Sequence, residues 1–187
     1  MSDPLHFVGF SGSLRKGSYN TMLLNAVREL LPENVSFETA SIDMPLYNAD
    51  NDLPEAAERP EQVKAFREIL AKADGIVIVS PEYNYSIPGG LKNAIDWASR
   101  GEDSPLLNKP VAVMGATPGL WGTIKMQVAF NTVFQFLNMR PVYKPEVLVN
   151  QAKNKFDEKG RLTDQMSRDI VNQKLQALKD LIIQLKK

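Results

Sequence analysis

Runs of consecutive apolar residues alternate along this chain with stretches whose apolar residues recur at helical spacing. The continuous runs indicate buried parallel strands at residues 5–10, 76–79 and 111–115, with a short strand at 35–40. Residues 141–149 supply a last strand or a bent pair of short strands around Pro145. The periodic stretches predict helices at 21–31, 61–73, 88–97, 124–137 and 164–187.

This alternation of strands and helices predicts an α/β protein. Five strands that alternate with five helices favour a doubly wound, parallel sheet with the order 2-1-3-4-5 and helices on both faces. No repeat, low-complexity tract or linker divides the sequence, so residues 1–187 are expected to form one domain. The polar loops after the first, third and fourth strands then meet at the carboxyl edge of the sheet, where open α/β proteins bind ligands.

The loop after the first strand has the composition of a phosphate site. It leads directly into a helix, whose first N–H groups are unpaired and whose dipole adds partial positive charge. The short polar side chains and the one cation that suit a phosphate are Ser13, Arg15, Ser18, Asn20 and Thr21. The loop is neither G-x-G-x-x-G nor a Walker A sequence. The alternative is a serine-rich turn that only caps the helix.

The loop after the third strand, Ser80 to Pro88, combines aromatic rings with exposed backbone. Its residues Glu82, Tyr83, Asn84 and Tyr85 precede a double glycine, which permits a close approach to backbone. A flat heteroaromatic ligand would suit this loop. The loop after the fourth strand, around Gly119 and Gly122, could close the other side of such a ligand, although an ordinary tight crossover would have a similar composition.

The long connection at 43–60 is the remaining candidate for a functional loop. Tyr47 could place an aromatic ring toward the site, or it could simply cover the edge of the core. The final helix is amphipathic and packs on the sheet or on a partner.

Composition excludes several classes of chemistry. The chain has no cysteine and one histidine, His6, so a thiolate nucleophile, a His/Cys metal site and a Ser-His-Asp triad are not expected. Lys+Arg and Asp+Glu are both 22, which favours neither a nucleic-acid nor a membrane partner. With no signal-peptide pattern and no apolar run near 18 residues, the expected location is cytoplasmic. Catalysis, if present, is expected to be carried by a cofactor.

Two motifs resemble those of the NAD(P)H-dependent FMN reductase family. They are GSLRKGSYN after the first strand and SPEYNYSIPGGLKNAIDW after the third, and the closest resemblance is to the chromate, quinone and azo-dye reductase branch. The similarity extends from about Phe7 to about Lys144. The resemblance implies a flavodoxin-like fold and FMN as the cofactor.

The resemblance also assigns roles to residues. It implies that the FMN phosphate is held by Ser13, Arg15, Ser18, Asn20 and Thr21. It implies that the isoalloxazine is lined by Pro81, Glu82, Tyr83, Asn84, Thr117, Pro118 and Gly119. Tyr85 is expected to face the nicotinamide or acceptor side or a neighbouring subunit, and Tyr47 is a second candidate for substrate binding; a packed loop tyrosine is the alternative for Tyr85.

The implied reaction is ping-pong hydride transfer from NAD(P)H to flavin N5 and onward to quinones, with chromate, ferric or azo compounds as further acceptors. No catalytic side chain is required, because proximity on the flavin face supplies most of the catalysis. Two alternatives stay open: a flavodoxin-like FMN electron-transfer protein and a cofactor-free regulatory protein of the same fold. The resemblance further implies a homodimer or a homotetramer, and the apolar helix at 125–137 together with the Tyr85 loop is the expected contact.

Overall fold

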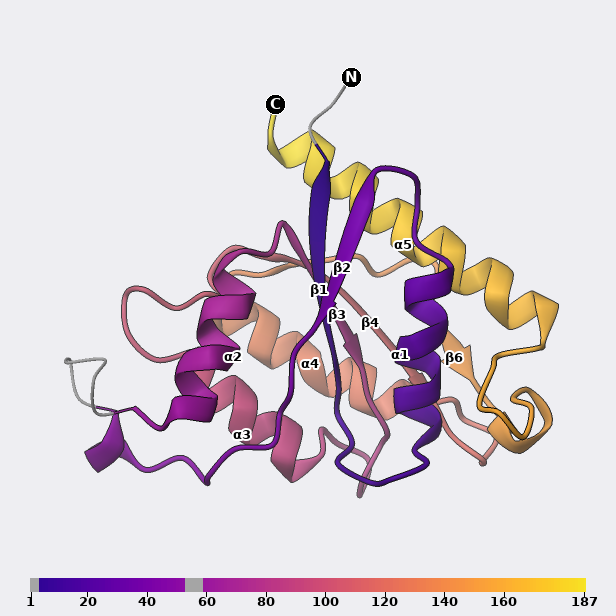
Figure 1. Ribbon diagram of the computed structural model, residues 1–187, viewed down its shortest axis with the longest axis horizontal. Helices are drawn as coiled ribbons and strands as arrows, with labels where there is room; N and C mark the ends of the chain where they lie inside the picture. Colours follow the sequence, from indigo (N-terminus) through magenta and orange to yellow (C-terminus); the bar gives the residue numbers. More distant parts are fainter. Residues whose placement is uncertain (1–3, 53–58) are drawn as a thin grey trace.

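The sheet of this protein has the strand order that the sequence predicts. The computed structural model describes residues 4–52 and 59–187. Its central path runs β2-β1-β3-β4-β5, with β6 also paired to β4 (Figure 1). The strands are β1 Leu5–Ser11, β2 Val35–Thr39, β3 Gly75–Val79, β4 Pro110–Ala116, β5 Arg140–Pro141 and β6 Leu148–Val149. All the pairings between these strands are parallel, as expected when helices connect them.

Helices cover both faces of the sheet. They are α1 Tyr19–Glu29, α2 Glu61–Ala71, α3 Gly89–Ala98, α4 Ile124–Phe136 and α5 Gln165–Leu185. The helices α1 and α5 pack on one face, and α2, α3 and α4 pack on the other, as Figure 1 shows. The described residues therefore form the flavodoxin-like, three-layered α/β arrangement that the sequence predicts.

The strands build two hydrophobic cores by strict alternation of their side chains. In β3, Ile76 and Ile78 contact the layer of α2, α3 and α4, whereas Val77 and Val79 contact the layer of α1 and α5. All five β3 residues are buried, which explains why its sequence is continuously apolar instead of alternating.

Of the two alternatives left open for the last sheet segment, the structure shows the pair of short strands and not one strand. Both β5 and β6 are two residues long, and Lys144 and Pro145 lie in the loop between them. The ammonium group of Lys174, which is 2% exposed on α5, donates to the carbonyl oxygens of Val142 and Tyr143 in this irregular stretch. Burial lowers the pKa of Lys174 to about 8. The buried cation thus satisfies two carbonyls that the short strands leave without a ladder partner.

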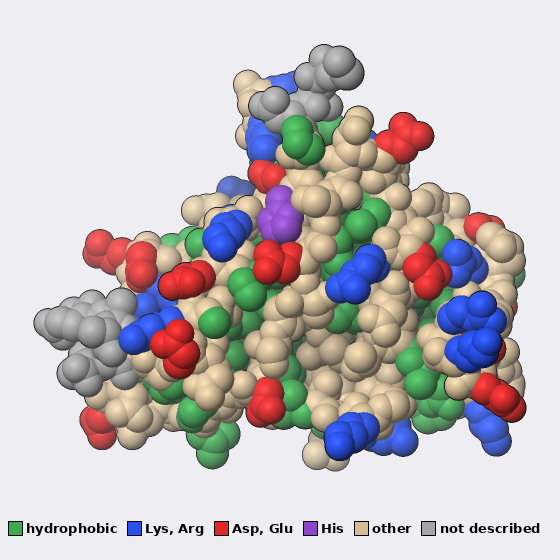
Figure 2. All heavy atoms as spheres, in the orientation of Figure 1, with side chains coloured by type: hydrophobic (Ala, Val, Ile, Leu, Met, Phe, Trp, Pro, Cys, Tyr) green, Lys and Arg blue, Asp and Glu red, His purple; other side chains and the backbone are tan. Residues whose placement is uncertain are grey.

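The surface and the helices add two observations. Figure 2 shows Lys and Arg side chains interspersed with Asp and Glu over one face of the molecule. Across residues 4–52 and 59–187, no helix combines the length and the apolarity that crossing a membrane requires.

Candidate functional site

Three loops meet at the carboxyl edge of the central strands. They comprise residues 12–18 after β1, residues 80–88 after β3 and residues 117–123 after β4. Two backbone hydrogen bonds extend the sheet into them: Gly12 N–H donates to Val79 O at 2.8 Å, and Ser80 N–H donates to Met114 O at 3.0 Å. The loops therefore begin side by side, as the predicted strand order requires.

The loop after β1 is prepared for an anion. Ser18 is the N-cap of α1, and its hydroxyl accepts from Asn20 N–H at 3.2 Å. The first turn of α1 contains no acidic residue, so nothing offsets its partial positive charge. Within the described chain the Arg15 guanidinium contacts only Gly17 O, at 3.4 Å, and its residue is exposed. These features fit a phosphate group at this helix terminus.

The hydroxyls of Ser13 and Thr21 each make a hydrogen bond within the protein. The Ser13 hydroxyl accepts from Arg15 N–H at 3.3 Å, and the Thr21 hydroxyl donates to Ser11 Oγ at 3.1 Å. The Ser13 hydroxyl lies in the loop and the Thr21 hydroxyl in the first turn of α1, and both keep further hydrogen-bonding capacity for a phosphate oxygen.

Asn20 is oriented differently from the other predicted phosphate residues. Its carboxamide accepts from Ala116 N–H at 2.8 Å and donates to Ala116 O at 2.9 Å, across 96 positions of the sequence. The residue is 3% exposed. Both ends of the carboxamide thus bond to the end of β4, and the side chain of Asn20 fixes α1 against β4.

The loop after β3 contains a tight hairpin. Tyr83 and Ser86 exchange two backbone hydrogen bonds, of 3.2 and 2.9 Å, around Asn84 and Tyr85. Both central residues have positive φ, 50° and 62°, which the twist of such a two-residue turn requires. Tyr83 and Tyr85 are 51% and 68% exposed. The hairpin therefore presents two aromatic rings at the surface instead of packing them in the core.

The double glycine leaves open space beside the hairpin. A Cβ atom built on Gly89 would meet no atom within 4 Å, and one on Gly90 would meet only Leu14 Cδ1, at 3.8 Å. Internal packing therefore does not require glycine at either position. An external flat ligand that lies close to the backbone would require it, so the residues present fit a flavin ring.

The predicted residues of the third loop are fixed by the segment that follows β6. Gln151 N–H donates to Gly119 O at 2.9 Å, and Ala152 N–H donates to Thr117 O at 3.0 Å. Pro118 is exposed between them. This loop also carries two exposed apolar residues that the sequence interpretation did not select, Leu120 at 65% and Trp121 at 76%. The available signal was the occurrence of large apolar residues within a loop otherwise rich in glycine and small polar residues.

Glu82 and α4 form the connection between the second and third loops. The Glu82 carboxylate accepts from Met126 N–H in the first turn of α4 at 3.0 Å. The Lys125 ammonium lies 3.1 Å from the centroid of the Tyr85 ring, a cation–π contact. The Glu82 side chain is consequently directed at α4.

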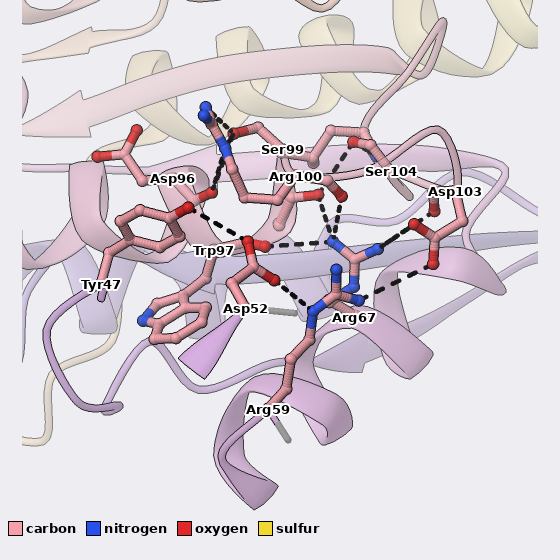
Figure 3. A network of polar contacts seen from close by, with 12 residues as sticks. Tyr47, Asp52, Arg59, Arg67, Asp96, Trp97, Ser99, Arg100, Asp103 and Ser104 are labelled. Carbon is pink, nitrogen blue, oxygen red and sulfur yellow. Dashed lines mark hydrogen bonds and ion pairs between the residues drawn. The ribbon is translucent and has the colours of Figure 1, made fainter. Parts of the chain in front are cut away.

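Tyr47 lies in a network of polar contacts, drawn in Figure 3. Its hydroxyl donates to Asp52 Oδ2 at 3.3 Å, and Asp52 also accepts from Arg59 at 2.6 Å. The ring packs edge-on against Trp97, with centroids 4.9 Å apart, and burial and the Asp52 carboxylate raise the pKa of the phenol. This arrangement favours the second interpretation of Tyr47, in which it covers the edge of the core.

The same network of polar contacts includes the C-terminus of helix α3. Arg67, 7% exposed on α2, donates to the carbonyl oxygens of Trp97, Ala98 and Arg100 at 3.2, 2.9 and 3.1 Å. It also pairs with Asp103 at 2.9 Å. The Trp97 and Ala98 carbonyls are unpaired groups of the α3 C-terminus and Arg100 follows it, so the guanidinium caps α3 and fixes the helix that begins at the double glycine.

The fold and the three loops together define a flavodoxin-like protein with a site for FMN. The sequence profile of the NADPH-dependent FMN reductase family matches residues 5–154. The chain belongs to this family. It is therefore an FMN-dependent NAD(P)H oxidoreductase, and both sequence motifs lie within the matched region.

Individual relatives agree with this assignment. The chain is 45% identical over 179 residues to an NAD(P)H-dependent FMN reductase of Pseudomonas aeruginosa, with 95% of each chain covered. It is 39% identical to a quinone reductase of Escherichia coli over the whole of both chains. Among solved structures, FerB of Paracoccus denitrificans, described as a flavoenzyme NAD(P)H:(acceptor) oxidoreductase, has a TM-score of 0.85 at 29% identity and covers 96% of this chain and 98% of its own.

Proposed function

We propose that this protein transfers electrons from NAD(P)H through FMN to quinones, and that chromate, ferric and azo compounds serve as further acceptors. The observation that carries the proposal is the position of two complementary surfaces at one edge of the sheet. One is the acid-free start of α1 with the Arg15 guanidinium, and the other is the exposed pair Tyr83 and Tyr85 beside the open glycines. The name of the Escherichia coli relative, quinone reductase, supports quinones as the acceptor class.

The residues of the chain bind and orient the FMN and its substrates, and none is needed as an acid or base. When bound, FMN supplies a ring system that accepts a hydride from a nicotinamide and returns electrons to an acceptor. Ser13, Arg15, Ser18 and the first turn of α1 would hold its phosphate, while the hairpin and the loop at 117–123 would border its ring. The only histidine, His6, bonds to Ser36 near the start of β1, away from the carboxyl edge. The Glu82 carboxylate is engaged by Met126 N–H.

Anaerobic spectroscopy tests this function. Purified protein loaded with FMN is expected to lose its flavin absorbance on addition of NADPH or NADH and to regain it on addition of a quinone. Parallel steady-state kinetics with both nucleotides and a short series of quinones, ferric, chromate and azo compounds would rank the substrates. Flavin that binds but is not bleached by either nucleotide would contradict the reductase function and favour the electron-transfer alternative.

The self-association that the sequence predicts has a matching surface. On α4, Met126, Phe130 and Phe134 are buried, whereas Val128 and Phe136 are 61% and 72% exposed. A second apolar face on a surface helix is typical of a contact with another protein. The partner proposed here is a second copy of this chain, in a homodimer or homotetramer whose contact includes α4 and the Tyr85 hairpin.

Light scattering of flavin-loaded, active protein tests the assembly. The expected mass is a multiple of the 20.9 kDa chain, and the double substitution Val128→Ser with Phe136→Ser is expected to lower it. A monomeric mass of the wild-type protein at micromolar concentration would contradict the proposed dimer.

A further inference from the structure

The helix α4 lacks the N-cap that its own sequence offers. Thr123 stands at the N-cap position, where a threonine hydroxyl ordinarily accepts an N–H bond from the first turn. Here the backbone of Thr123 is left-handed, with φ 68° and ψ 25°, and its side chain makes no capping bond. A β-branched residue rarely adopts this conformation, so surrounding contacts must enforce it.

The hydroxyl of Thr123 is turned into the protein. The residue is 1% exposed, and its Oγ1 is buried without a hydrogen-bond partner within the described residues. It lies beside Gly115, where an added Cβ would be only 2.1 Å from it. The first-turn N–H groups of α4 must therefore find an acceptor elsewhere, since a helix end leaves them unpaired.

Glu82 supplies that acceptor from another loop. Its carboxylate accepts from Met126 N–H, the third residue of α4, at 3.0 Å and across 44 positions of the sequence. This is the amide that an N-cap side chain would bond, and a carboxylate also interacts favourably with the positive end of the helix dipole. The Lys125 ammonium, one residue earlier, contacts the Tyr85 ring of the same loop.

We propose that Glu82 is a positioning residue that caps α4 from the hairpin loop and thereby fixes the spacing between the two loops that border the flavin. The carboxylate belongs to residues 80–88, and the helix it caps begins directly after residues 117–123. The hydrogen bond from Met126 N–H to Glu82 therefore holds the loop at 80–88 against the start of α4 and the loop at 117–123. The inference rests on the flavin site proposed above and assigns the Glu82 side chain no contact with the flavin.

Two measurements on the apo-protein test the proposal: hydrogen exchange of the Met126 amide and the dissociation constant for added FMN. Glu82→Ala removes the acceptor, and both are expected to change by roughly tenfold, toward faster exchange and weaker binding, as is typical when an N-cap acceptor is lost. Glu82→Asp retains the charge but shortens the side chain by one methylene. It is therefore expected to speed Met126 exchange and weaken FMN binding by less than Glu82→Ala does. Glu82→Gln retains the length and an acceptor oxygen and is expected to keep both within about threefold of wild type.

The outcomes separate this proposal from its alternatives. Weaker FMN binding with unchanged Met126 exchange would mean that Glu82 contacts the flavin directly, and faster exchange with unchanged FMN binding would mean that the cap serves stability alone; either result overturns the proposal. If Glu82→Ala is not obtained as folded protein, the Asp and Gln pair gives the same comparison. Glu33→Ala, an exposed glutamate just before β2 and therefore at the amino end of the parallel strands, is the matched control and should leave both measurements unchanged. Failure of wild-type protein to bind FMN would instead contradict the proposed function itself.

Discussion

The two strand-to-helix junctions at β1–α1 and β4–α4 cap the first turns of their helices in different ways. At the first, Ser18 has an extended backbone and caps the helix through a bond to Asn20 N–H, two residues on. At the second, Thr123 is left-handed, its hydroxyl is buried without a partner in the described chain, and the cap comes from Glu82. The helix cap at the first junction is local, whereas the cap at the second comes from a distant part of the sequence.

This difference matches the tasks of the two junctions. A phosphate site needs a helix end whose positive charge is left free for the ligand, and the acid-free start of α1 provides it. The start of α4 already has a carboxylate on its first turn, so it is unsuited to a second anion site. In the proposed site, its N-terminal contacts instead fix the position of a loop assigned to the border of the flavin ring.

Gly115→Ala should produce the largest effect, because it breaks the β4–α4 junction at its tightest point. An added Cβ would lie 2.1 Å from Thr123 Oγ1 and 2.4 Å from the backbone oxygen of Ser80. Backbone cannot move away as a flexible side chain can, so the free energy of unfolding is expected to fall by more than about 3 kcal/mol. Urea unfolding of the apo-protein measures it.

Gly89→Ala is the matched control for this substitution. A Cβ there meets nothing within 4 Å, so the stability of the apo-protein should be unchanged or rise by up to about 1 kcal/mol, since alanine favours a helix over glycine. FMN affinity should nevertheless fall, because the methyl group would enter the space assigned to the flavin. Unchanged FMN affinity would show that the flavin does not approach this backbone.

The same contrast explains how far the sequence alone could predict the structure. Strand order, the two helical layers and the polar β1 loop follow from local patterns, such as the continuous run at 76–79 and the serine that precedes α1. The orientations of Asn20 and Glu82 depend on partners 96 and 44 positions away, which no local pattern identifies. The left-handed backbone of Thr123 could not be predicted from the sequence either, because threonine ordinarily avoids this conformation.

Asn20→Asp tests whether the β1–α1 junction is as self-contained as its cap suggests. A carboxylate can still accept from Ala116 N–H, but it cannot donate to Ala116 O, and it would place a buried charge beside that carbonyl oxygen. We expect a loss of about 2–3 kcal/mol of stability, from the unpaired carbonyl and the desolvated charge. A loss of FMN affinity without loss of stability would instead indicate a direct phosphate contact of the side chain.

Arg15→Ala should change binding and leave the fold intact. In the described chain its guanidinium contacts only Gly17 O, at 3.4 Å, so unfolding in urea should be unaltered. Loss of a charge-assisted bond to phosphate, worth about 2 kcal/mol, predicts FMN affinity roughly 10–100-fold weaker. Titration of apo-protein with FMN measures this effect. Arg140→Ala, at an exposed position on β5, is the control, and equal affinities for both variants would refute the assignment.

Thr123→Val has the smallest expected effect and the opposite sign. It keeps the branched shape and the left-handed backbone of the β4–α4 junction but replaces a buried hydroxyl that has no partner among the described residues. Burying an unpaired hydroxyl is unfavourable, so removing it should raise the free energy of unfolding by about 1 kcal/mol. Because Glu82 provides the cap, exchange of the Met126 amide should stay at the wild-type level. A fall in stability would show that the hydroxyl is hydrogen-bonded in solution, and faster Met126 exchange would show that Thr123 contributes to the cap after all.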